Sequence, residues 1–572
     1  MIGAVEVHPG LSRLGFPFDP LIPFGGRPLI ARTVEAALRC GQVETVAVLA
    51  PSGHAAAVEA ALACLPECTG ADAGAGGGGR KRGRKERGLS PPAQGSAGGR
   101  VVVVPCEGED VPERSNVRRL RRMAPHSWRA GWAIPFAVAE GGNPRWLLQA
   151  LQRFQAARAI LFPQAAPFLR PDLVEAQIVE AARHPGAGAC LSTAPPGVAG
   201  DILSRDYLSD VVRAALPIDA PMRFLPDRPE RSLDNQGVFH WFPEAVSGFT
   251  TRLTAESARG LAILSRIDAD LRPERVEGAE RWLERLSERG DILAGPVPEE
   301  LRWWITARRR GVSSIDPGLP GDFEGEPDID PTLFRRACEE LRGWQESRIV
   351  LRGGEPLLHP RFGEILEAAR GAGAGLVQVE TDGLGLDERT VDLLAASADV
   401  VVVSLDALRP ETYRALRGID GLEEASAGVE RLLERSARSG GPAVAVEMRI
   451  VAENESEREP FFDRWFVRTP FVVVRGPSDR AGQVPSRAVH PARTPRRIPC
   501  LQLLGTLAVL PDGRAVACEN DYRGLFPVGD LRRESIEAIW SGPRLAELRA
   551  MHSSQTWDHH PLCSRCGDWC RR

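Results

Sequence analysis

The residues whose type and spacing most clearly indicate chemistry are cysteines near the end of the chain. Five of the eleven cysteines lie beyond residue 499: Cys500, Cys518, Cys563, Cys566 and Cys570. Thiolates are soft ligands that suit zinc or iron–sulfur clusters. In a reducing compartment, such clustering indicates metal binding before disulfides. An iron–sulfur cluster, a structural zinc site and unligated thiols are all open at this point.

Two local features would bring these cysteines to one centre. The two sulfurs of Cys563-Ser-Arg-Cys566 can reach the same metal from a single tight turn. The segment Leu507–Cys518, LAVLPDGRAVAC, predicts a β-hairpin with Asp512-Gly513 in its turn. Because the tail after residue 499 is too small for a large core, a bound metal would help it to fold.

The cysteine tail resembles a SPASM domain. The resemblance rests on Cys500, a glycine at 513, Cys518 and a distant Cys-x2-Cys, with Val528-Gly529-Asp530 and Ser535–Trp540 between them. SPASM domains follow radical S-adenosylmethionine enzymes and hold auxiliary [4Fe–4S] clusters. The resemblance implies one cluster on Cys500, Cys518, Cys563 and Cys566, since the chain has too few cysteines for two. Cys570 is then a spare thiol or an alternative ligand.

A second group of motifs lies at the ends of three predicted strands. The first strand runs into Gly353-Gly354-Glu355-Pro356, where paired glycines allow close approach to a ligand and the carboxylate can bind an ammonium. The next two strands end in Glu380-Thr-Asp-Gly383 and Ser404-Leu-Asp406. Together these resemble the radical S-adenosylmethionine fold over residues 300–475. The resemblance implies a pocket for that cofactor formed by Gly353, Gly354, Glu355, Thr381 and Ser404.

One element of that family is absent. The family places Cys-x3-Cys-x2-Cys after its first strand, but the predicted strand Arg302–Thr306 is followed by ARRRGVSSIDPGLPGDFE, which has no cysteine. Cys338 stands alone in a helical pattern and is interpreted as a core residue. Without that cluster no electron reaches the sulfonium, so we expect a retired scaffold or a domain that binds a ligand without radical chemistry. No catalytic residue is predicted, and S-adenosylmethionine binding stays open.

The start of the chain resembles cytidylyltransferases and sugar-nucleotide transferases over about residues 1–260. The resemblance rests on Ser12-Arg13-Leu14, on the segment Leu21–Leu29, and on Ile160-Leu-Phe-Pro-Gln-Ala-Ala166. The family's phosphate-binding lysine is missing, because the two lysines of the chain, Lys81 and Lys85, both lie in a Gly-rich run. Ala165 or Ala166 replaces the metal-binding aspartate, and alanine offers Mg²⁺ no oxygen ligand. We therefore expect a non-catalytic domain that could still bind a nucleotide or sugar.

Strands and helices alternate along the chain, which predicts an α/β fold class with mostly parallel sheets. Near the start we expect strands at Ile2–Val7, Glu44–Ala50, Val101–Val104 and Ala159–Phe162. Six later strands, with helices between most of them, predict a partial (βα)6 barrel whose strand ends carry the ligand site. These strands are Arg302–Thr306, Arg348–Leu351, Leu376–Glu380, Val400–Ser404, Val444–Ile450 and Phe471–Val474.

The expected domains are a mostly parallel α/β sandwich over 1–290, the partial barrel over 300–475, a linker over 476–498 and a small cysteine-rich SPASM domain over 499–572. Residues 69–100 are expected to form a flexible low-complexity insertion, because they are Gly, Ala, Ser and Arg with little apolar content. This three-part order resembles the spiro-SPASM group of proteins.

Composition limits the function further. The net charge of −4 argues against dedicated nucleic-acid binding. No apolar run is long enough for a membrane span, and the opening MIGAVEVHPG lacks a signal-peptide pattern, so a cytoplasmic location is expected. We predict an iron–sulfur accessory or binding factor for a peptide, a protein or a cell-envelope precursor. The alternatives are an unconventional S-adenosylmethionine-dependent or sugar-nucleotide or glycan-modifying enzyme, and a zinc-stabilised interaction module.

Overall fold

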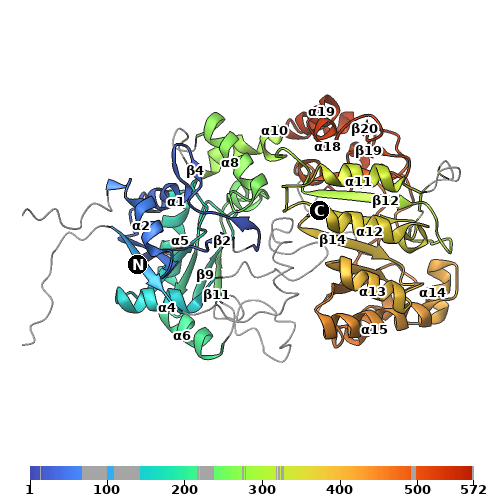
Figure 1. The fold of residues 1–572 in the computed structure, drawn as a ribbon, viewed down its shortest axis with the longest axis horizontal. Coiled ribbons are helices and arrows are strands. Elements are labelled where there is room, and N and C mark those ends of the chain that lie inside the picture. Colours follow the sequence, from blue (N-terminus) through green and yellow to red (C-terminus); the bar gives the residue numbers. More distant parts are fainter. Residues whose placement is uncertain are drawn as a thin grey trace, which may run out of the picture.

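The computed structural model describes residues 1–12, 14–66, 100–107, 142–215, 218, 237–272, 276, 278–316, 318–319, 323, 328–469, 471–490 and 497–569. Arg13, Cys570, both lysines and nearly all of the predicted insertion at 69–100 lie outside these residues. The described part folds around two large sheets, one in each half of the molecule (Figure 1).

The first sheet is mostly parallel, as predicted. Its strand order is β11-β9-β10-β8-β1-β6-β7, and every neighbouring pair is parallel except those of β10. The strands are β1 (Ile2–Glu6), β6 (Thr45–Pro51), β7 (Val101–Cys106), β8 (Arg158–Phe162), β9 (Ala189–Ser192), β10 (Asp201–Ser204) and β11 (Gly237–His240). Two short ribbons join β2 (Gly10–Leu11) to β3 (Pro17–Phe18) and β4 (Pro23–Phe24) to β5 (Arg27–Pro28).

Helices cover both faces of this sheet because its strands are apolar on both sides. One face packs on α1 (Leu29–Leu38), α2 (Ala55–Leu62) and α5 (Pro171–Arg183). The other packs on α4 (Pro144–Arg153) and α6 (Arg205–Arg213). Then follow α7 (Glu244–Ser247), α8 (Ala258–Asp270), α9 (Ala279–Ser287) and α10 (Gly290–Leu293). The buried guanidinium of Arg259 on α8 donates to the carbonyls of Ala294 and Leu504, which ties the two halves together.

The second sheet contains the predicted six parallel strands in sequence order. These are β12 (Glu300–Thr306), β13 (Arg348–Gly353), β14 (Leu376–Thr381), β15 (Val400–Ser404), β16 (Ala443–Arg449) and β17 (Val472–Arg475). We call them, with their helices, the barrel. Its helices are α11 (Pro331–Glu339), α12 (Phe362–Gly371), α13 (Glu388–Ser397), α14 (Pro410–Arg417), α15 (Leu422–Ser439) and α16 (Arg458–Phe466), with short 3-10 turns at Pro356–Leu358 and Glu455–Glu457. The α/β fold class is thus confirmed.

The sheet does not end with the barrel. β18 (Thr506–Val509) pairs in parallel with β12, and β19 (Arg514–Val516) and β20 (Pro527–Asp530) extend it antiparallel. The turn between β18 and β19 contains Gly513 at φ +86°, in the left-handed region that glycine tolerates. The remaining elements are α17 (Gln502–Gly505), α18 (Ile536–Trp540), α19 (Pro543–Ser553) and 3-10 turns at Trp557–His559 and Cys563–Arg565.

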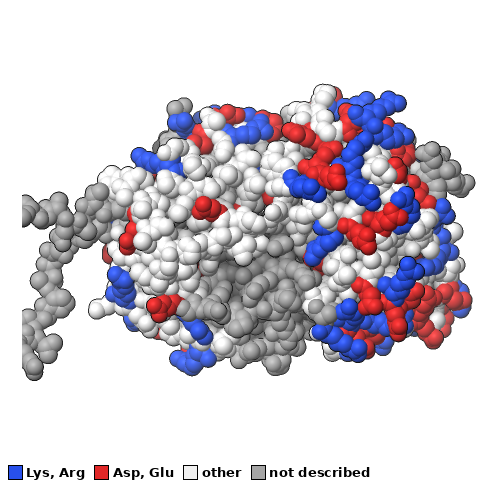
Figure 2. Space-filling model, viewed as in Figure 1, with Lys and Arg blue, Asp and Glu red and all other residues white. Residues whose placement is uncertain are grey.

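Along β12, residue alternation separates an apolar outer face from a charged inner face. In β12, Leu301, Trp303 and Ile305 are fully buried against the helices. Glu300 and Arg302 therefore point to the opposite face, because successive side chains of a strand alternate. On the outer surface, acidic and basic residues are interspersed over the barrel helices in the view of Figure 2.

Candidate metal centre and barrel interior

Four of the five predicted metal ligands line one cavity, which we call the cysteine cavity. Cys500 precedes α17, Cys518 follows β19, and Cys563 and Cys566 bound the last 3-10 turn. Cys570 lies outside the described residues. The cavity is closed by mostly apolar neighbours, Leu503, Phe526, Leu548, Leu562 and Trp569, with Arg497, Asn520, His552 and His560 among the polar ones. The cavity thus brings together Cys500 and Cys566, which lie 66 residues apart in the chain.

Burial makes these thiols hard to ionise without a cation. Burial, followed by the proximity of the other cysteines, raises the pKa of Cys500 to about 12 and that of Cys563 to about 11. The pKa of Cys518 is raised for the same two reasons. Four thiolates in one site need a bound metal centre to compensate their charge. Within the described ranges, no three Cys, His, Asp or Glu side chains are arranged to hold a single metal ion.

Neighbouring groups position two of these cysteines. The Nδ1 atom of His552 accepts a hydrogen bond of 3.1 Å from the backbone N–H of Cys500. Burial lowers the pKa of His552 to about 4, so the ring is neutral and can accept at neutral pH. The backbone N–H of Asp568 donates to Cys566 Sγ at 3.3 Å. Sequence reasoning missed these groups, because no local pattern marks them.

The Gly-Gly-Glu turn contacts the segment that follows β12. The backbone N–H of Gly354 donates to Thr306 O at 2.8 Å, and that of Glu355 to Arg308 O at 2.7 Å. A Cβ atom on Gly354 would lie 2.1 Å from Arg308 O, and one on Gly353 would lie 2.4 Å from Thr306 O. Both positions therefore require glycine for this backbone contact.

The Glu355 carboxylate accepts hydrogen bonds from its own neighbours. Thr381 Oγ1 donates to it at 2.8 Å, the backbone N–H of Asp382 at 2.7 Å and that of Leu357 at 3.1 Å. Burial, and then the nearby Asp382 carboxylate, raises the pKa of Glu355 well above its usual value. Four of the five residues predicted for a cofactor pocket thus lie together. Ser404 instead donates to Glu447 at 2.8 Å.

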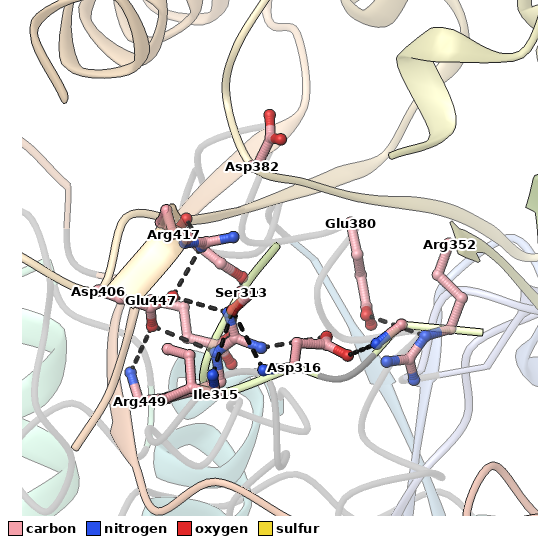
Figure 3. A network of polar contacts seen from close by, with 12 residues as sticks. Ser313, Ile315, Asp316, Arg352, Glu380, Asp382, Asp406, Arg417, Glu447 and Arg449 are labelled. Carbon is pink, nitrogen blue, oxygen red and sulfur yellow. Dashed lines mark hydrogen bonds and ion pairs between the residues drawn. The ribbon is translucent and has the colours of Figure 1, made fainter. Parts of the chain in front are cut away.

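The inside of the barrel holds a network of buried ion pairs that sequence reasoning did not identify (Figure 3). Asp406 binds Arg449 and Arg417, each at 2.7 Å, and Arg449 also reaches Asp316 at 3.2 Å. Although burial acts to raise it, the arginines hold the pKa of Asp406 below its usual range. Asp406 belongs to the Ser404-Leu-Asp406 motif of the sequence, but no local pattern marks its arginine partners.

Glu519 joins the cysteine tail to this network. It follows Cys518 directly and pairs with Arg352 on β13 and, at 3.0 Å, with Arg302 on β12. Although burial opposes it, Arg352 and then Arg302 hold the pKa of Glu519 well below its usual value. The segment around Cys518 therefore contacts both the cysteine cavity and the barrel interior.

The transferase-like residues at the start of the chain occupy a packed region. Ala165 and Ala166 are fully buried. Nearby, the buried Glu6 at the end of β1 accepts hydrogen bonds from the backbone N–H of Asn143 at 3.0 Å and contacts His8 at 3.2 Å.

Replacement of Gly354 by alanine is expected to destabilise the protein by about 1–3 kcal/mol, because the new Cβ atom would overlap a backbone carbonyl. The measurement is the urea midpoint of unfolding. Gly371→Ala is the matched control, since this glycine ends α12 with no neighbour within 4 Å of a Cβ position, and alanine there should be neutral or stabilising. Equal urea midpoints for the two variants would contradict the close approach of Gly354 to the carbonyl of Arg308.

Two family models match the chain. Residues 312–463 match the radical SAM superfamily, and residues 500–567 match SPASM, an iron–sulfur cluster-binding domain. The chain therefore carries a segment that matches the radical SAM superfamily and one that matches the SPASM domain, as the motifs predicted. No helix within the described ranges has the length and apolar character needed to span a membrane.

Relatives match only parts of the chain. An uncharacterized protein of Treponema pallidum is 25% identical over 231 residues, which cover 38% of this chain and 62% of the relative. A probable GTP 3',8-cyclase of Methanothermobacter marburgensis is 34% identical over 130 residues, which cover 23% of this chain and 42% of the relative. The match thus spans less than two thirds of either relative.

A solved cytidylyltransferase from Leptospira borgpetersenii aligns with 51% of this chain and 95% of its own, at 12% identity and a TM-score of 0.34. A similarity this weak carries no argument about activity.

Proposed function

We propose that the chain binds one [4Fe–4S] cluster through Cys500, Cys518, Cys563 and Cys566, and acts as an accessory or binding factor. The observation that carries this proposal is the convergence of four half-buried cysteines on one cavity within a segment that matches an iron–sulfur domain. Thiolate sulfur is the ligand such clusters require, and a bound cluster supplies one-electron transfer. The side chains of the cysteine cavity bind the cluster and exclude water from it.

The second part of the proposal is that the barrel works without a cluster of its own. Between residues 300 and 475 the sequence holds a single cysteine, Cys338, and its side chain is buried in the apolar core on α11. The contacts of the Gly-Gly-Glu turn support a packing role for that motif, since its backbone and carboxylate bond to the chain itself. The barrel is then a scaffold that does not cleave S-adenosylmethionine reductively.

We further propose that the domains span residues 1–290, 300–475 and 499–572, and that a linker spans residues 476–498. The transferase-like domain is non-catalytic, and the partner is a peptide, a protein or a cell-envelope precursor. The absence of oxygen ligands at Ala165 and Ala166 supports a non-catalytic first domain, because Mg²⁺ needs hard oxygen donors.

The test is anaerobic purification followed by measurement of iron, sulfide and zinc and of the visible spectrum. We expect about four irons and about four sulfides per chain. We also expect no 5'-deoxyadenosine above background when S-adenosylmethionine and dithionite are added. About one zinc per chain without iron would contradict the proposed cluster and indicate a structural zinc site instead. About eight irons per chain, or cleavage of S-adenosylmethionine, would contradict the proposal that the barrel works without a cluster of its own.

A further inference from the structure

The turn that follows Cys518 contacts two different sites. Its first residue, Glu519, turns into the barrel and pairs with Arg352. Its second, Asn520, turns toward the cysteine cavity and lines it. Only 2% of Asn520 is exposed. A buried amide must satisfy its hydrogen-bonding groups within the protein, so its partners indicate what it does.

The partners of Asn520 aim its amide nitrogen at a cysteine sulfur. Nδ2 lies 3.6 Å from Cys566 Sγ and 3.3 Å from Asp568 Oδ2. Because a carboxylate only accepts hydrogen bonds, Asp568 requires the nitrogen and not the oxygen of the amide on that side. Ser478 holds the arrangement from the other side, with its hydroxyl 3.2 Å from Asn520 Oδ1 and 2.5 Å from Asp568 Oδ2.

Hydrogen bonds to cluster sulfurs set the reduction potential. An N–H group that points at a thiolate stabilises negative charge on it, and reduction of a cluster adds negative charge. The reduced form therefore gains more from the bond than the oxidised form, and the potential rises. Cys566 receives two such donors, the Asn520 amide and the backbone N–H of Asp568.

We propose that Asn520 is a positioning residue that raises the reduction potential of the cluster through its hydrogen bond to Cys566. The inference rests on the proposed cluster ligation. It assigns a redox role to a residue outside the Cys-x2-Cys motif, and it places that role on the same turn that anchors the cysteine tail in the barrel through Glu519.

The test is an anaerobic redox titration of the full-length holoprotein, followed by visible absorption and electron paramagnetic resonance. Asn520→Ala is expected to shift the midpoint potential to a lower value while iron and sulfide content stay at the wild-type level. Gln483→Ala is the matched control. The Gln483 Nε2 atom donates to the backbone carbonyl of Asn520 and to that of Arg480, not to a cysteine sulfur. The cluster of this variant should therefore have the wild-type midpoint potential.

A second variant keeps the inference testable if Asn520→Ala loses the cluster. Ser478→Ala leaves the amide in place but removes the hydroxyl that orients it, so a smaller shift in the same direction is expected. Cluster-loaded variants with the wild-type potential would overturn the role of Asn520 and leave the cluster proposal intact. A wild-type protein without iron would instead overturn the proposed function itself.

Discussion

Replacing Cys518 by serine is expected to reduce the iron content from about four atoms per chain to less than about one. Cys518 is half-buried and lines one cavity with three other cysteines, and a serine hydroxyl is a poor ligand for a site made for soft thiolates. Three thiolates would leave one iron without a protein ligand. Because metal binding to a small domain contributes to its folding, the melting temperature should also fall. Iron analysis and thermal unfolding of the anaerobic protein measure both effects.

Two cysteine variants serve as controls for this prediction. Cys338→Ala should retain the iron, since its side chain is packed in the apolar core with Phe334 and Leu341. Cys570→Ser should retain it as well if the four cysteines of the cavity suffice. Loss of iron in the Cys338 variant would contradict the assignment of all the iron to the cysteine cavity. Retention of all iron in Cys518→Ser would remove that residue from the ligand set.

Replacing Asp406 by alanine is expected to destabilise the protein by about 3–5 kcal/mol, because it leaves buried arginines without their anion. The carboxylate is fully buried and binds both Arg449 and Arg417 at 2.7 Å. Its backbone has φ +63°, which aspartate tolerates better than alanine. The measurement is the free energy of unfolding from urea titration.

A surface ion pair provides the comparison. Asp420 pairs with Arg414, but 70% of its side chain is exposed, and exposed pairs contribute only about 0–1 kcal/mol. Asp420→Ala should therefore have little effect. A similar small loss for Asp406→Ala would mean that water reaches the barrel interior and screens its charges.

The pH dependence of the Asp406 effect has a definite sign. The pKa of this carboxyl is lowered in the folded state by Arg449 and Arg417, against the effect of burial. Its contribution to stability is therefore present above the unfolded pKa of about 4 and is lost as the pH falls through the folded pKa. The stability difference between wild type and Asp406→Asn should shrink below pH ~4. A difference that grows on acidification would contradict this assignment.

Much of the fold was predictable because its strands are buried on both sides. Val400–Ser404 and the other barrel strands are apolar runs between helical patterns, and such runs indicate parallel strands covered by helices. β15 has the predicted bounds, and the others differ by a few residues. The hairpin before Cys518 was predictable from Asp512-Gly513, since a glycine at positive φ is a local requirement of the turn.

The pairing of β18 with β12 was not predictable. These strands lie about 200 residues apart, and their parallel register, Glu300 with Thr506 and Trp303 with Val509, leaves no local signature. The ion pairs of Glu519 were not predictable either. Nothing in the sequence distinguishes this glutamate from other polar residues in turns. Its arginine partners come from β12 and β13, which only the assembled sheet brings near.

The amino-acid sequence by itself determined the α/β class, the two family domains and the candidate cysteine ligands. These conclusions depend on residue type and on short spacing, both of which are present in the sequence itself. Tertiary structure alone decided that four cysteines line one cavity, that Asn520 faces Cys566, and that charged strand residues pair across the barrel interior. Such contacts join segments that are distant in the chain. Their partners are selected by packing and by the cost of burying an unpaired charge, neither of which a local pattern specifies.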